Sequence, residues 1–138
     1  MREIVIDTET TGLDPREGHR IVEIAALELM HHMPTGRTFH CYVCPERDMP
    51  AEAYAIHGLS AEFLGGFPPF AAVVDEFLAF VANDPMVIHN AEFDLAFLNA
   101  ELGRIDRAPI SGAVVDTLGL ARRRFPGAPA SLDALCRR

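Results

Sequence analysis

The chain of 138 residues contains no lysine and no tryptophan, and all 12 of its basic residues are arginines. Against them stand 20 acidic residues, so the formal net charge is −8 at pH 7. This balance excludes nucleic-acid binding by bulk electrostatic attraction, because the protein as a whole repels phosphate. Action on a phosphodiester would require bound divalent cations that reverse the local charge, or a partner that delivers the substrate.

Long apolar runs are also missing. The longest apolar stretch, Phe70 to Ala82, is interrupted by Asp75 and Glu76, whereas a membrane-spanning helix needs roughly 18 uninterrupted apolar residues. The first residues, MREIVID, do not have the layout of a signal peptide. We therefore expect a cytoplasmic protein without membrane contact. Its length and its hydrophobic content of 49% predict one globular domain over residues 1–138.

Cysteine is scarce, with three residues at positions 41, 44 and 136. An odd number in an apparently cytosolic chain argues against a disulfide framework. Cys41 and Cys44 form a C-x-x-C pair, which raises the alternative of a zinc or redox site. The surrounding residues alternate like a strand, so the odd offset would point the two thiols to opposite faces, and no second pair completes four ligands. Ordinary strand residues are the favoured interpretation.

Short apolar runs predict five strands, the first of which ends at Asp7, Thr8 and Glu9. Pro34 to Gly36 is predicted to be the turn between the second and third strands. The first three strands are consecutive and therefore antiparallel, and the last two are separated by helices. This order predicts an α/β fold with a mixed five-stranded sheet flanked by helices. The expected strands are Ile4–Glu9, Ile21–Met30, Arg37–Cys44, Met86–His89 and Ala113–Val115, the last of which ends at Asp116 and Thr117.

Apolar residues at helical spacing predict helices between the later strands. After a brief helical turn over Ala51–Ile56, a helix begins at Phe70. The next covers Ala91–Leu102, with Asn90 as its N-cap and Gly103 as its terminator. An Arg-rich helix follows Asp116, which is predicted to cap it, and runs through Phe125. After a loop over Pro126–Ala130, a last helix begins at Leu132.

Asp7 and Glu9 are the first candidate functional residues. They are two apart on a strand, so both side chains point to the same face. Two carboxylates there raise one another's pKa unless a cation lies between them, and hard oxygen ligands favour Mg²⁺ or Mn²⁺. The alternative is a solvated strand end that opens a loop.

Asp94 is the third candidate acid. It lies in the first turn of a predicted helix, where the helix dipole favours a carboxylate. Phe93, Phe97 and Leu98 are expected to anchor this helix in the core, so that Asp94 overhangs the end of the first strand. A solvent-facing helical aspartate is the alternative.

Six separated segments along the chain form an ordered set: IVIDTETTGLDP (4–15), RIVEIAALEL (20–29), AIHGLS (55–60), VIHNAEFDLAFL (87–98), VVDTLGLARRRFPG (114–127) and SLDALCRR (131–138). In this order they resemble the segments of 3′-to-5′ exonucleases of the DEDDh type. The resemblance covers essentially the whole chain and is strongest to the proofreading, epsilon-type branch that works with bacterial replicative polymerases.

The resemblance implies a ribonuclease-H-like sheet and a two-metal site. Asp7, Glu9 and Asp94 would be catalytic metal ligands for Mg²⁺ or Mn²⁺, which would also make an acidic site attractive to a nucleotide. The substrate would be the single-stranded or frayed 3′ end of DNA, and the expected partner a replicative DNA polymerase. Matching positions imply further substrate contacts at Thr8, Thr10, Thr11, Gly12, Leu13, Glu52, His57, Asn90 and Phe93. For His57, a loop histidine that closes a turn is the alternative.

One motif of the family is not matched. Its third motif, a His followed by a fourth Asp, belongs on a helix beyond the SLDALC segment, and no histidine follows His89. We expect a C-terminally truncated domain that lacks this helix and has impaired activity, because loss of a general base costs roughly 10²- to 10⁴-fold in rate. If 138 residues is the natural length, the uncovered apolar face would favour a homodimer.

Two functional hypotheses therefore stand. The first is a metal-dependent 3′-to-5′ exonuclease, with DNA preferred over RNA although no residue discriminates the sugar on physical grounds. The second is a catalytically inactive, nuclease-like module that binds a polymerase or a nucleic-acid end.

Overall fold

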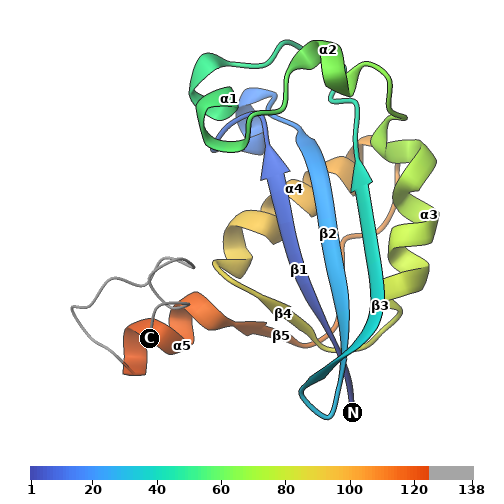
Figure 1. Cartoon of the computed structure of the whole chain (residues 1–138), viewed down its shortest axis with the longest axis vertical. Coiled ribbons are helices and arrows are strands. Elements are labelled where there is room, and N and C mark those ends of the chain that lie inside the picture. The colour runs from blue at the N-terminus through green and yellow to red at the C-terminus, as the bar shows by residue number, and fades with distance from the viewer. Residues whose placement is uncertain (125–138) are drawn as a thin grey trace.

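Five strands form one mixed sheet in the computed structural model, which describes residues 1–124 (Figure 1). The strands are β1 (Arg2–Thr10), β2 (Ile21–Met30), β3 (Met33–Tyr42), β4 (Met86–Ile88) and β5 (Val114–Asp116). Their spatial order is β3-β2-β1-β4-β5. β2 is antiparallel to both β1 and β3, whereas β4 is parallel to both β1 and β5. The predicted α/β fold, with antiparallel strands followed by parallel ones, is confirmed.

The helices connect and cover these strands. They are η1 (Pro15–Glu17), α1 (Ala51–His57), α2 (Ala61–Leu64), α3 (Phe70–Val81), α4 (Ala91–Arg104) and α5 (Thr117–Arg124). In Figure 1, α1 and α2 lie beyond the end of the sheet at which β1 ends. No helix of the described part is long and apolar enough to cross a membrane. Phe125 and the loop and last helix predicted over residues 126–138 lie outside the described residues.

Alternation along β1 decides which residues enter the core. Ile4, Ile6 and Thr8 are buried, and they face the same way as the core residues of α3 and α4, such as Phe77 and Phe97. The alternate residues, Val5 among them, are more exposed and form the second face of the sheet. This second face carries Asp7 and Glu9.

The prediction for the turn between β2 and β3 was wrong. The chain reverses at His31 and His32, which both have positive φ (51° and 66°), as a two-residue type I′ hairpin turn requires. Pro34–Gly36 instead belongs to β3, where a bulge opposite β2 accommodates it. β3 consequently begins at Met33 and ends at Tyr42, two residues before Cys44.

β1 begins two residues before the predicted start, at Arg2, and ends one residue after Glu9, at Thr10, so that Asp7 and Glu9 lie within it as predicted. Its pairing with β4 stops at Ile6 and Ile88, while its pairing with β2 continues to Thr10. Asp7 is therefore the first residue beyond the parallel pairing of β1 and β4. It lies at the carboxyl end of these strands, where such sheets place their sites.

Asn90 does not cap α4 through its side chain, contrary to prediction. It adopts the left-handed conformation (φ 60°, ψ 59°), which asparagine tolerates, and its backbone N–H donates to Asp116 Oδ1 at 3.0 Å. Asp116 also accepts from the backbone N–H of Leu118 at 2.9 Å, which confirms it as the cap of α5. α4 continues past the predicted terminator Gly103 to Arg104.

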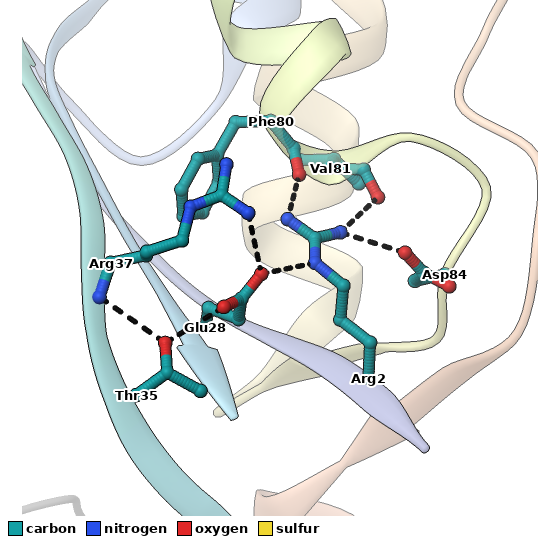
Figure 2. Close-up of polar contacts among 7 residues, drawn as sticks. All are labelled: Arg2, Glu28, Thr35, Arg37, Phe80, Val81 and Asp84. Carbon is teal, nitrogen blue, oxygen red and sulfur yellow. Dashed lines mark hydrogen bonds and ion pairs between the residues drawn. The ribbon is translucent and has the colours of Figure 1, made fainter. Parts of the chain in front are cut away.

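A buried carboxylate ties the strands together at the start of β1 (Figure 2). Glu28, 5% exposed, accepts from Arg2 Nε at 2.5 Å, from the Thr35 hydroxyl at 2.7 Å and from Arg37 at 3.1 Å. Arg2 also donates to main-chain carbonyls at the end of α3. These donors hold the pKa of Glu28 below its ordinary value, with the bond from Arg2 as the largest cause. The network therefore joins three strands and a helix far from the predicted site.

Replacing Glu28 with Gln should lower the thermal stability at pH 7. Because the folded-state pKa of Glu28 is lowered, its contribution is complete above the ordinary Glu value of 4.5 and is lost as the pH falls through the lowered value. Thermal unfolding measured from pH 7 downward should show that the difference in Tm between wild type and Glu28→Gln becomes smaller in acid. A matched change at the exposed Glu62 should leave stability nearly unchanged. A difference in Tm that stays constant with pH would contradict the interpretation that Glu28 is ionised in the folded protein.

Candidate active site

Two of the three predicted acids lie side by side on the second face of β1. Asp7 is exposed and Glu9 is half-buried. Partial desolvation raises the pKa of both carboxyls. The negative charge of Asp7 raises the pKa of Glu9 further, and Glu23 acts on both in the same direction. Negative charge is thus concentrated at the end of the parallel strand pair.

Glu23 is a neighbour of this pair that the sequence analysis missed. It lies directly across from Glu9 in the β1–β2 register and accepts a bond from His40 Nε2 on β3 at 2.5 Å. Glu23 stands inside the RIVEI segment, but its position opposite Glu9 follows from a register that the intervening loop sets. Like charges directly opposite one another destabilise a sheet, and the bond from His40 offsets part of this repulsion on the Glu23 side.

Asp94 approaches the end of β1 from the helical side. It is 4% exposed, its Oδ1 accepts from the Thr8 hydroxyl at 3.1 Å, and its Oδ2 is buried without a hydrogen-bond partner. Desolvation raises its pKa from an ordinary 3.8 to about 7, and the charges of Asp7 and Glu9 contribute in the same direction. The three acids therefore act on one another electrostatically, although within residues 1–124 no three Asp, Glu, His or Cys side chains stand in the arrangement of a metal-binding cluster.

The donor set fits a hard divalent cation. Asp7, Glu9 and Asp94 offer carboxylate oxygens, the ligands that Mg²⁺ and Mn²⁺ prefer. An unpartnered carboxylate oxygen buried among like charges is costly, and a cation would remove both the missing bond and the repulsion.

A buried ion pair fixes α4, and with it Asp94, relative to the sheet. Glu101 on α4 is 1% exposed and accepts from Arg20 Nη2 at 2.7 Å, from Arg20 Nε at 3.0 Å and from the backbone N–H of Ile21 at 3.1 Å. Phe97 and Leu98 on the same helix are fully buried, as predicted. Arg20 and Glu101 are positioning residues that the sequence analysis did not single out.

The loop after β1 uses its own hydroxyl groups to hold its shape. Thr10 donates to the carbonyl of Gly12 at 2.6 Å, and the Thr11 hydroxyl accepts from the Arg20 N–H and lies 2.9 Å from His19 Nδ1. The ring of His19 packs against Gly12 so closely that a Cβ there would lie 2.4 Å from it. His19 is a further residue that the sequence analysis missed, because only the folded loop brings it under Gly12.

His57 fastens α1 to this loop. Its Nδ1 accepts from the Leu59 N–H at 3.0 Å, so its proton is on Nε2, which donates to the carbonyl of Thr10 at 3.1 Å. Gly58 follows with a φ of 70° and ends the helix. Both ring nitrogens are thus engaged with backbone groups.

A cavity of about 460 Å³ opens between the β1 loop and α1, with Phe93 of α4 in its wall. Leu13 (82% exposed) and Ile56 (77% exposed) present apolar side chains to it, and Glu9 supplies a carboxylate. Ile56 stands within the AIHGLS segment, but the sequence analysis did not single it out as a lining residue. The predicted residues that line the cavity are Thr8, Glu9, Thr10, Thr11, Gly12, Leu13, Glu52, His57 and Phe93.

Three predicted residues do not line this cavity. Asp7 and Asp94 lie beside it at the end of β1. Asn90 lines a separate groove of about 930 Å³ between η1 and α4, which shares Leu13 and Phe93 with the cavity. The two hollows are therefore neighbours.

Comparison with known proteins gives a consistent result. A family model described as Exonuclease matches residues 4–138. DNA polymerase III subunit epsilon of Rickettsia typhi is 54% identical over 142 residues, which cover 100% of this chain and 62% of the relative. The Escherichia coli K12 protein of the same name is 44% identical over 145 residues, or 99% of this chain and 60% of the relative. The chain thus spans about three fifths of the length of these relatives. A solved structure of exonuclease X in complex with 5′ overhanging duplex DNA superposes with a TM-score of 0.78 at 28% identity, covering 98% of this chain and 71% of that one.

Without divalent cations, the stability of the chain should fall as the pH rises from about 4 to about 7. Because the folded-state pKa of Asp94 is raised, the folded protein binds this proton more tightly than the unfolded chain does. At about 1.4 kcal/mol per pKa unit, the unfolding free energy should fall by at most about 4 kcal/mol over this pH range. Thermal unfolding in a chelator should show a smaller slope for Asp94→Asn than for wild type. Equal slopes would contradict this origin.

Replacing Gly12 with Ala should cost about 1–3 kcal/mol of unfolding free energy, because the new Cβ overlaps the His19 ring. In a His19→Ala background the same change should cost much less, which a double-mutant cycle by chemical denaturation measures. Gly103→Ala is the matched control, since nothing lies within 4 Å of a Cβ there. Additive costs for Gly12 and His19 would rule out the steric explanation.

Proposed function

The chain belongs to the exonuclease family, and from this premise we propose that it is a divalent-metal-dependent 3′-to-5′ exonuclease that trims DNA 3′ ends in proofreading. The observation that carries the proposal is the buried carboxylate of Asp94. Its Oδ2 has no hydrogen-bond partner, and its charge is coupled to those of Asp7 and Glu9. A site that keeps a buried, ionisable carboxyl next to two others is built for a cation rather than for stability.

Asp7, Glu9 and Asp94 would hold the metal ions. Bound in such a site, divalent cations lower the pKa of an attacking water and neutralise the scissile phosphate. The chain's own residues place the substrate. The β1 loop and α1 form the walls of the cavity, and the bond from His57 to Thr10 keeps these walls together. The acidic surface elsewhere discourages binding of phosphate away from the metals.

The cavity suits the terminal nucleotide of a strand. Its volume of about 460 Å³ lies within the usual range for small ligands. Leu13, Ile56 and Phe93 offer apolar contacts that any base can use. The name of the relatives, DNA polymerase III subunit epsilon, supports DNA as substrate and a replicative polymerase as partner. Exonuclease X, which was solved with duplex DNA, supports DNA as well.

A 3′-labelled single strand of DNA tests the proposal. With Mg²⁺ or Mn²⁺ we expect release of labelled mononucleotide, and none with a chelator. Asp7→Asn and Asp94→Asn should each lower the rate by about 100-fold or more, because each removes a ligand on which the metal chemistry depends. An RNA strand of the same sequence measures the preference between the two sugars.

Asp75→Asn is the matched control, since Asp75 is an exposed carboxylate that pairs with Arg107 on the surface. Its activity should equal that of wild type. The assay should use the 138-residue chain and any longer product that the reading frame encodes. If neither releases mononucleotide but the DNA end still binds, the chain is a binding module and the enzyme proposal falls.

A further inference from the structure

The hydrogen bond between Thr8 and Asp94 crosses from one face of β1 to α4. Thr8 stands between Asp7 and Glu9 in the sequence, and by alternation its side chain points to the opposite face of the strand. It is 7% exposed, and its hydroxyl donates to Asp94 Oδ1 at 3.1 Å. Thr8, which stands between Asp7 and Glu9 in the sequence, thus bonds to Asp94 on the opposite face of the strand.

The geometry of this contact leaves little freedom. Thr8 is β-branched and lies on a paired strand, so its side chain has few available rotamers. Oδ1 of Asp94 is occupied by the hydroxyl, while Oδ2 has no hydrogen-bond partner although it is equally buried. The two oxygens of one carboxylate are therefore in different environments.

We propose that Thr8 is a positioning residue for metal binding, which holds Oδ1 of Asp94 so that Oδ2 is the oxygen presented to a divalent cation. The inference rests on the metal-dependent function proposed above. It assigns to Thr8 a task through Asp94, in addition to the place of Thr8 in the cavity wall. Partners of metal ligands commonly fix ligand orientation in this way.

A purely structural bond would be better made by a neutral group. An asparagine at position 94 would accept the same hydroxyl hydrogen without placing a carboxylate at a position that is 4% exposed. The Thr8 hydroxyl bonds to only one of the two carboxylate oxygens and leaves Oδ2 without a partner. The arrangement becomes favourable when a cation reaches Oδ2.

The test is the affinity of the full chain for Mn²⁺ alone, followed by electron paramagnetic resonance of the free ion. Thr8→Val removes the hydroxyl at nearly constant shape and should weaken binding by about 10- to 100-fold, whereas Thr8→Ser keeps a donor and should stay within about threefold of wild type. Asp94→Asn serves as the reference for loss of the ligand. If Thr8→Val does not fold, as judged by circular dichroism, Thr8→Ala replaces it.

Thr35→Val is the matched control, because the Thr35 hydroxyl also donates to a buried carboxylate, that of Glu28, at the other end of the sheet. It should lower stability without changing Mn²⁺ affinity. Unchanged affinity in folded Thr8→Val, equal losses in Thr8→Val and Thr8→Ser, or an equal loss in Thr35→Val would each overturn the positioning role. A wild-type chain that does not bind Mn²⁺ would instead overturn the proposed function itself.

Discussion

The docking of α4 across the end of β1 is the contact on which the candidate site depends. Asp94, Phe97, Leu98 and Glu101 lie at i, i+3, i+4 and i+7 of this helix, and all four are buried. The two apolar residues in the middle supply the packing energy, and the two carboxylates at the ends are bonded by Arg20 and Thr8. Burying charges gains little stability even when they are paired. The polar ends of the stripe are better understood as setting the position of the helix along the sheet.

The same arrangement concentrates negative charge at the carboxyl end of β1. Asp7, Glu9, Glu23 and Asp94 come from three different elements, and the pKa of each of the first two is raised by the charge of Glu23. A fold selected only for stability would not keep them together, since each repels its neighbours. Functional sites commonly retain such unfavourable groups at the expense of stability. In a chain of net charge −8, a cation bound beside these carboxylates would offset their repulsion of a phosphate under the proposed function.

The sequence allowed the mixed sheet to be predicted, with antiparallel strands followed by parallel ones, because apolar runs and their spacing report those features directly. The roles of the three acids come from ordered motifs and stay a prediction. It did not reveal contacts that depend on register or on loop conformation. Glu23 stands opposite Glu9 only because of how the loop over residues 11–20 joins β1 to β2. The turn at His31 and His32 was missed because Pro34–Gly36 has the stronger turn composition, yet a bulge in β3 absorbs it. Asn90 was expected to use its side chain, whereas its tolerance of positive φ is what the structure uses.

The polar groups around the cavity are mostly committed to the protein itself. The hydroxyls of Thr10 and Thr11 and both nitrogens of His57 bond to groups of the loop and α1. Recognition of a particular base requires free donors and acceptors aimed at its edge. Because these groups hold the walls in place, the cavity offers mainly apolar side chains and the carboxylates of Glu9, Glu17 and Glu52. Under the proposed function, selection at such a site would follow from whether a 3′ end can leave its duplex and enter, and not from which base it carries.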